Sequence, residues 1–141
     1  MNWKSVRIGV IFIWVGFVCA ISFMEAWLKF TAPGVSLTTG LSIGRVVFSA
    51  LNKVELVLCS VIVLSYLPMQ PLDFVKEWVL TLVIIVLVFQ TVYLLPQLSA
   101  RIDLWLSGAP LANSNLHTTY VGLEVTKVLL LLRLGFKQFI I

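Results

Sequence analysis

Acidic and basic residues stand inside otherwise apolar stretches of this chain, where they could do chemistry. Glu55 lies in one such stretch, and Glu124 and Lys127 lie three residues apart in another. At about 100° per helical residue, Glu124 and Lys127 fall on one face with His117 and Tyr120. Carboxylates and an imidazole in apolar surroundings could act as titratable or ligating groups. The pattern predicts a site for an ion or a polar head group.

Including the stretch with Glu55, three apolar stretches besides that of Glu124 carry polar rows of the same kind. Ser22, Glu25 and Lys29 form one row, and Gln90, Tyr93 and Gln97 form another. The third joins Arg45, Asn52 and Glu55, with Ser49 extending it. If these stretches are antiparallel helices, all rows lie in the same half of the assembly and converge. The predicted network comprises Glu25, Arg45, Asn52, Glu55, Gln90, Tyr93, Gln97, His117, Tyr120, Glu124 and Lys127.

The apolar stretches that position these residues must be surrounded by lipid. Of the 141 residues, 60% are hydrophobic and 11% charged, with a mean hydropathy of +1.07, whereas soluble domains carry about 25% charged residues. One small core could not bury so many apolar side chains. The composition excludes a soluble globular protein and predicts an all-α, polytopic integral membrane protein.

Four stretches are long enough to be transmembrane helices, each of roughly 20 residues. They predict a single four-helix transmembrane domain over residues 1–141, with spans at about 7–28, 42–66, 77–98 and 114–137. The second and fourth spans must carry charged residues inside the membrane. The alternative is that one of them lies on the surface as an amphipathic helix. Breaks are expected at Ala32-Pro33-Gly34, at Pro96 and at Gly108–Pro110, and Asp73, Asn113 and Ser114 are candidate N-caps.

The distribution of basic residues predicts the orientation of the four spans. The side with both termini holds five of them, and the opposite side three: Lys4, Arg7, Lys76, Arg133 and Lys137 against Lys29, Arg45 and Arg101. Because basic loops stay in the cytoplasm, both termini are predicted to be cytoplasmic, in a bacterial inner (plasma) membrane. Glu55 and Glu124 fall near mid-membrane, where Lys53 or Lys127 is expected to pair with them.

Several functional classes lack a signature in the sequence. Cys19 and Cys59 have no second Cys or His at metal spacing, so neither a zinc site nor a disulfide is indicated. The basic residues form no run or stripe, which argues against nucleic-acid binding. A single histidine argues against bis-histidine haem ligation. No nucleophile–base pair or phosphate-binding loop occurs, so we lean against an enzyme, and no cofactor or particular metal is indicated.

Part of the chain resembles the transmembrane protein 205-like family of small four-helix membrane proteins. The resemblance is carried by Phe30-Thr31-Ala32-Pro33, Gly44-Arg45 and Val47-Phe48-Ser49-Ala50-Leu51, and later by Pro96 and Asn115-Leu116-His117. It implies the four-span topology and the transport or handling of metals. Glu25, Glu55, Glu124 and Lys127 depart from the usual apolar pattern of that family.

A second resemblance is to the MAPEG family of glutathione-using membrane enzymes, which are usually trimeric. Its second helix carries Arg-Ala-x-x-Asn-x-x-Glu, to which Ala50-Leu51-Asn52-Lys53-Val54-Glu55 is similar. The spacing from Ala to Asn is one residue shorter here, and Ser49 stands in place of the arginine. This alternative implies a glutathione-dependent enzyme acting on a lipophilic substrate.

The network has two interpretations that the residues leave open. It could bind or pass a small ion or polar ligand, or its hydrogen bonds could hold the helices together. The function we expect is therefore a non-enzymatic membrane protein with a buried polar cluster, or a subunit of a membrane complex. Its expected partners are the lipid bilayer and either further copies of the chain or other membrane proteins.

Overall fold

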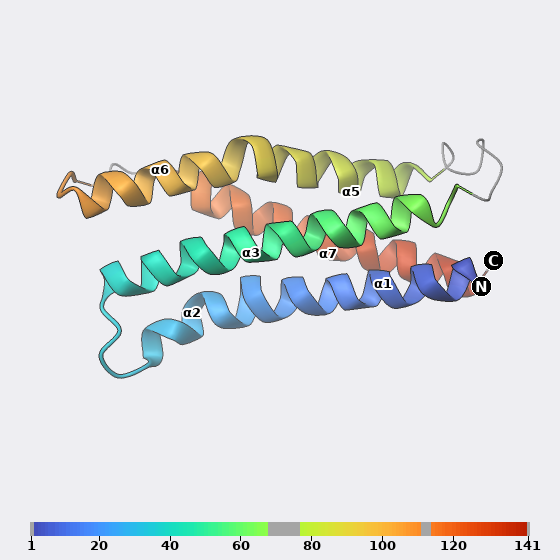
Figure 1. Ribbon diagram of the computed structural model, residues 1–141, viewed down its shortest axis with the longest axis horizontal. Helices are drawn as coiled ribbons and strands as arrows, with labels where there is room; N and C mark the ends of the chain where they lie inside the picture. Colours follow the sequence, from blue (N-terminus) through green and yellow to red (C-terminus); the bar gives the residue numbers. More distant parts are fainter. Residues whose placement is uncertain (1, 68–76, 111–113, 141) are drawn as a thin grey trace.

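The regular structure of the chain is helical throughout the part described by the computed structural model, residues 2–67, 77–110 and 114–140. Figure 1 shows long helical segments lying side by side, with the two termini at the same end. The all-α prediction is confirmed. In chain order the elements are α1 (Trp3–Val18), η1 (Cys19–Glu25), α2 (Ala26–Leu28), η2 (Lys29–Thr31), α3 (Leu37–Leu64), α5 (Trp78–Phe89), η3 (Gln90–Leu94), α6 (Leu95–Leu106) and α7 (Leu116–Ile140).

Short polar residues and glycines set the helix ends. Asn2 caps α1 by accepting from the Ser5 N–H, and Ser36 caps α3 by accepting from the Thr39 N–H. Gly34 has a φ of +81°, a left-handed conformation that suits glycine in the turn before α3. Of the predicted caps, Asp73 and Asn113 lie outside the described residues, and Ser114 Oγ accepts from the Leu116 N–H at 3.1 Å at the start of α7.

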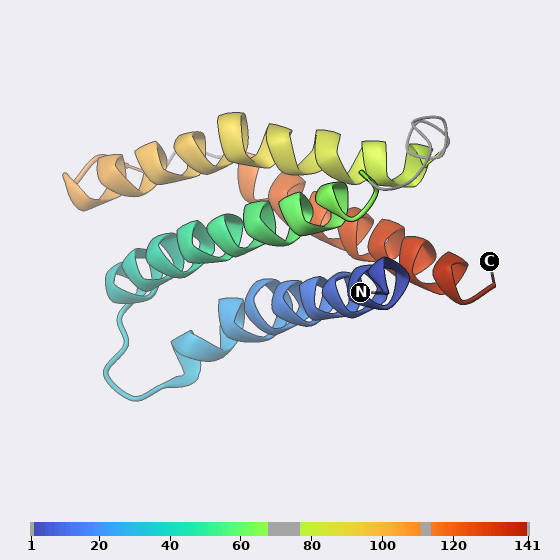
Figure 2. The same ribbon diagram turned by 45° about the vertical axis from the view of Figure 1, so that its right-hand side comes forward.

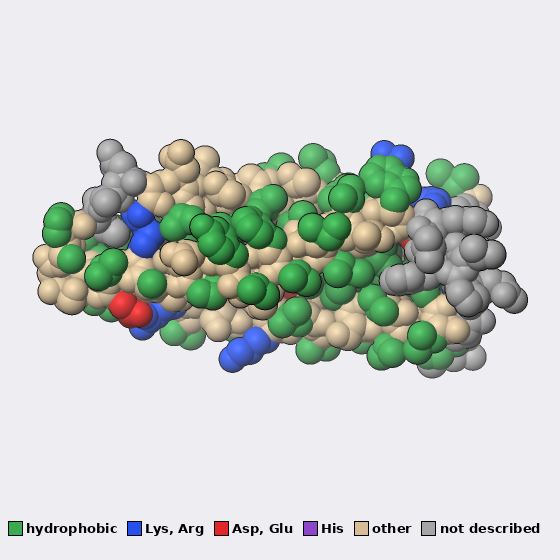
Figure 3. Space-filling view, turned by 90° about the horizontal axis from the view of Figure 1, so that it is seen from above, with side chains coloured by type: hydrophobic (Ala, Val, Ile, Leu, Met, Phe, Trp, Pro, Cys, Tyr) green, Lys and Arg blue, Asp and Glu red, His purple; other side chains and the backbone are tan. Residues whose placement is uncertain are grey.

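Three continuous helical segments are long and apolar enough to cross a membrane: Trp3–Thr31, Leu37–Leu64 and Trp78–Leu106. Each has 28 or 29 residues, or about 42 Å at 1.5 Å per residue, against a hydrocarbon core of about 30 Å. Apolar side chains also cover much of the outer surface, and Figure 3 shows them along the length of one face. Exposure of this kind indicates a membrane protein.

The fourth long helix, α7, packs along α1 and α5 as part of the bundle (Figures 1 and 2). Its buried residues Leu131 and Leu134 join a core that includes Ile11 and Trp14. Gly135 permits close packing, because a Cβ there would lie 3.1 Å from Ile11. α7 is not among the segments apolar enough to span, since it carries charged residues along its length, but Glu124 and Lys127 point into the bundle.

Two segments of π-helix interrupt the long helices at similar depths, η1 in the first and η3 in the third. We expected the third helix to break at Pro96, but it continues to Leu106. Proline lacks an N–H and its ring crowds the carbonyl four residues earlier, and the wider π turn just before Pro96 accommodates both effects. The observed helix therefore extends beyond the predicted span of residues 77–98.

Candidate functional site

A sealed ionic cluster lies at the centre of the bundle. The Lys127 ammonium is 2.5 Å from Glu55 Oε1 and 2.8 Å from Glu124 Oε1. It also donates to Gln90 Oε1 at 2.8 Å. All four side chains are at most 1% exposed. An ammonium has three protons to donate, and those of Lys127 are directed at Glu55 of α3, Gln90 of η3 and Glu124 of its own helix.

Residues of the first helix complete the cluster. Trp14 Nε1 donates to Glu55 Oε1 at 2.8 Å, and Ser22 Oγ donates to Glu124 Oε2 at 3.1 Å. Gln90 Nε2 donates to Glu124 Oε1 at 2.7 Å, so both oxygens of Glu124 have partners. Ser22 and Gln90 both belong to the π segments, which are often found at functional positions.

Trp14 is the member of this cluster that stood in none of the predicted polar rows. A signal for it exists, because Trp3, Trp27, Trp78 and Trp105 fall at predicted span ends whereas Trp14 falls mid-span. A buried indole N–H needs an acceptor, which in an apolar core must be a polar side chain. Pairing the lone mid-span tryptophan with a mid-span acid would have suggested the contact with Glu55.

Some of the predicted residues form separate pairs near the cluster or at the end of the bundle away from the termini. Asn52 donates to Thr91 at 2.8 Å, and Glu25 pairs with Lys29 at 3.2 Å. Arg45 forms an ion pair with Asp103. These contacts join neighbouring turns or helices. Asn52, Glu25 and Arg45 therefore lie outside the Lys127 cluster.

Three predicted members are exposed: His117, which lies at the start of α7, and Tyr93 and Gln97, which do not point into the bundle. Tyr93 is 50% exposed and stacks on Phe89, and Gln97 is also exposed. The reason is η3: a π turn contains more residues than an α turn, so positions after Gln90 are rotated away from the expected face. Lys53, which we considered as a counter-charge, is exposed because it lies two residues from Glu55 and so on the opposite side of α3.

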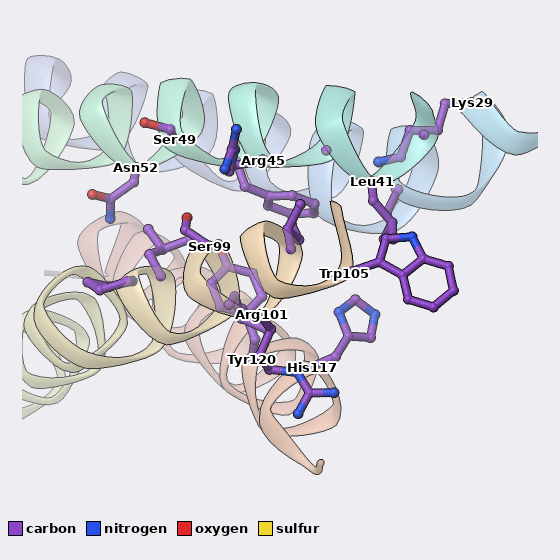
Figure 4. A pocket seen from close by; sticks show the side chains of 18 of the residues that line it. Lys29, Leu41, Arg45, Ser49, Asn52, Ser99, Arg101, Trp105, His117 and Tyr120 are labelled. Carbon is purple, nitrogen blue, oxygen red and sulfur yellow. The ribbon is translucent and has the colours of Figure 1, made fainter. Parts of the chain in front are cut away.

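Next to the cluster, towards the end of the bundle away from the termini, is a cavity of about 660 Å³. Figure 4 shows side chains of α3, α6 and α7 gathered around it. Asn52, Thr91 and Tyr120 line its inner part, and Tyr120 interacts with Glu124 of the cluster. Apolar residues dominate the walls: Ala26, Phe30, Leu37, Leu41, Phe48, Leu95, Pro96, Leu98, Ile102 and Trp105.

The charged side chains that line the cavity are all basic. They are Lys29, Arg45 and Arg101, and His117 also lines it. No carboxylate belongs to the lining within the described part of the chain. The acidic partners of Lys29 and Arg45, which are Glu25 and Asp103, lie outside it. A ligand in the cavity would meet apolar walls, the ion-paired side chains of Lys29 and Arg45, and Arg101.

The cavity exists because the helices differ in length at this end. α7 begins short of the end reached by α3 and α6 (Figure 1), so it does not fill the space between them. Two glycines of α3 allow side chains that line the cavity to pack against the α3 backbone. A Cβ on Gly40 would collide with the Phe30 ring, and one on Gly44 would lie 3.0 Å from Lys29 Nζ. A larger residue at either position would displace a side chain that lines the cavity.

A metal centre has no support in the described residues, where no group of three His, Cys, Asp or Glu side chains converges. Comparison with known proteins does not supply a function either. No family model matches the chain, and neither a curated protein nor a solved structure matches it. The cluster and the cavity are therefore the features of the molecule that bear on its function.

Proposed function

We propose that the chain is an integral membrane protein with four spanning helices and both termini in the cytoplasm. The outward surface of α7 supports its inclusion as the fourth span, because Val125, Leu129 and Phe136 are exposed there while Glu124 and Lys127 are buried. Within the bundle Lys127 forms an ion pair with each of the two acids, which lowers the cost of placing α7 in lipid. The cavity then lies in the outer half of the bilayer.

In that position we propose that the protein binds an amphipathic ligand with an anionic head group. The observation that carries this proposal is the cavity, which combines apolar walls with exclusively basic charged side chains. Its volume of about 660 Å³ is typical of small-molecule sites. The apolar part of such a ligand would lie along Leu41, Phe48 and Leu95, and its head group would lie near Arg45 and His117.

The sealed cluster is better suited to holding the helices together and forming a polar floor than to binding the ligand itself. The donors of Lys127 and the oxygens of Glu124 already have protein partners. A ligand would have to displace these contacts to enter. We therefore assign ligand binding to the cavity and tight interhelical contact to the cluster.

The proposal can be tested with three single-chain amphiphiles that share a dodecyl chain: dodecyl phosphate, dodecyl maltoside and dodecyltrimethylammonium. The purified protein in a neutral detergent should gain thermal stability with dodecyl phosphate alone, because a ligand that binds the folded state stabilises it. At 100 times the Kd the gain is about 2.7 kcal/mol. Equal gains from all three amphiphiles would refute selection for an anionic head.

Two variants and a control locate the effect. Arg45→Gln removes a cation from the cavity, and Ser99→Phe fills its wall, so both should reduce the gain in stability from dodecyl phosphate. Lys137→Gln removes a cation at the end of the bundle with the termini and should leave the gain intact. A reduction that is equal in Arg45→Gln and Lys137→Gln would indicate non-specific charge attraction and would overturn the assignment.

A further inference from the structure

Lys53 is a charged side chain on the outer surface of α3, surrounded by apolar residues. It is exposed, and Val46, Val57 and Leu64 on the same face are 68%, 63% and 55% exposed. Lys53 makes no ion pair, hydrogen bond or ring contact with the residues described at 2–67, 77–110 and 114–140. In the folded chain it therefore faces whatever surrounds α3.

The depth of Lys53 makes this exposure costly in a bilayer. It lies 11 residues before the end of α3 at Leu64, or about 17 Å at 1.5 Å per residue. A hydrocarbon core is about 30 Å thick, so Lys53 lies close to its middle. From there a lysine stem is too short to bring the ammonium easily to the interface, and charged residues at this depth ordinarily pair with one another or with polar groups.

We propose that the surface of α3 around Lys53, formed with Val46, Val57 and Leu64, docks a transmembrane helix of another protein that carries a carboxylate near mid-bilayer. A carboxylate is the group that complements the ammonium, and the flanking apolar residues suit contact with a lipid-embedded helix. The proposal rests on the proposed membrane placement of α3. It does not depend on ligand binding in the cavity.

The partner is a different protein and not a second copy of this chain. The acids that lie at a matching depth, Glu55 and Glu124, are buried at 1% and 0% exposure and already paired with Lys127. Among the described residues the remaining acids lie towards the helix ends: Glu25, Glu77 and Asp103. Within residues 2–67, 77–110 and 114–140, a second copy would therefore present no carboxylate to Lys53, and two facing lysines would repel.

The test uses a synthetic leucine–alanine transmembrane helix with one central Glu as the probe. The protein and the probe are labelled with a fluorescence donor and acceptor and reconstituted in phosphatidylcholine vesicles, and flotation first establishes that the protein is in the bilayer. Energy transfer should report association about tenfold tighter for the Glu probe than for a matched Gln probe. Lys53→Leu, at an exposed position that should not disturb folding, should remove this difference.

A relocation variant supplies the control. Lys53→Leu combined with Val57→Lys moves the cation one turn along the same face, so it should prefer a probe whose Glu is moved by four residues. Equal association of the Glu and Gln probes with the wild-type chain would overturn the proposal, as would self-association of the wild-type chain that Lys53→Leu abolishes. If flotation fails, the membrane placement itself is wrong, whatever the probes do.

Discussion

Replacing Lys127 by methionine should destabilise the protein far more than replacing either of its acidic partners by glutamine. The ammonium stands 2.5 Å from Glu55 Oε1 and 2.8 Å from Glu124 Oε1, and all three side chains are at most 1% exposed. Without it, two buried carboxylates face each other. Breaking a buried pair in this way costs about 3–5 kcal/mol. At roughly 3 °C per kcal/mol, the midpoint of thermal unfolding should fall by about 10–15 °C.

Glu124→Gln should be milder, because Lys127 still pairs with Glu55 and an amide side chain can keep part of the hydrogen bonding to Gln90 and Ser22. We expect a cost of about 1–2 kcal/mol. In the double variant the remaining acid, Glu55, keeps its bond from Trp14. The double variant should therefore cost about 1–3 kcal/mol less than the sum of the two single changes.

The assay is unfolding in detergent by circular dichroism for the wild type, both single variants and the double variant. Lys137→Met is the control, because the Lys137 side chain is 39% exposed and its partner Glu77 is 11% exposed, against 0% and 1% for Lys127 and Glu55, so the loss of this pair should cost less than the loss of Lys127. The reasoning is refuted if the Lys127 and Glu124 changes are strictly additive. It is equally refuted if Lys127→Met unfolds no earlier than Lys137→Met.

Three further outcomes follow from the same contacts. Trp14→Phe should lower the free energy of unfolding by about 1–3 kcal/mol, because it leaves Glu55 without an indole donor. Trp27→Phe is the control and should be nearly neutral, because Trp27 is 60% exposed. Equal unfolding midpoints for the two variants would contradict this. With the native cysteines replaced, single cysteines at Ser5 and Ser107 should label from opposite sides of the membrane, and labelling of both from one side would contradict four spans with cytoplasmic termini. Glutathione should not raise the unfolding temperature, because Glu55 is already occupied by Lys127; a concentration-dependent rise would instead favour the MAPEG alternative.

The helical class follows from the sequence because it depends on local and compositional properties. An apolar excess of this size has to face lipid, and backbone groups in lipid must be satisfied within helices. The need for charge pairing also follows, since Glu55, Glu124 and Lys127 occur within apolar stretches. Helical spacing then identifies Glu124, Lys127 and Tyr120 as neighbours on one face of α7, and all three are buried.

Only the tertiary structure decides which polar side chains meet. Helical spacing already excludes Lys53 as the partner of Glu55, two residues away, and the packing of α7 against α1 and α5 brings Lys127 to Glu55. The π segment η3 turns Tyr93 outward, which a uniform helical period cannot anticipate. The cavity depends on where α7 begins relative to α3 and α6. Contacts between distant segments and the phase of each helix are collective properties of packing, so no local pattern encodes them.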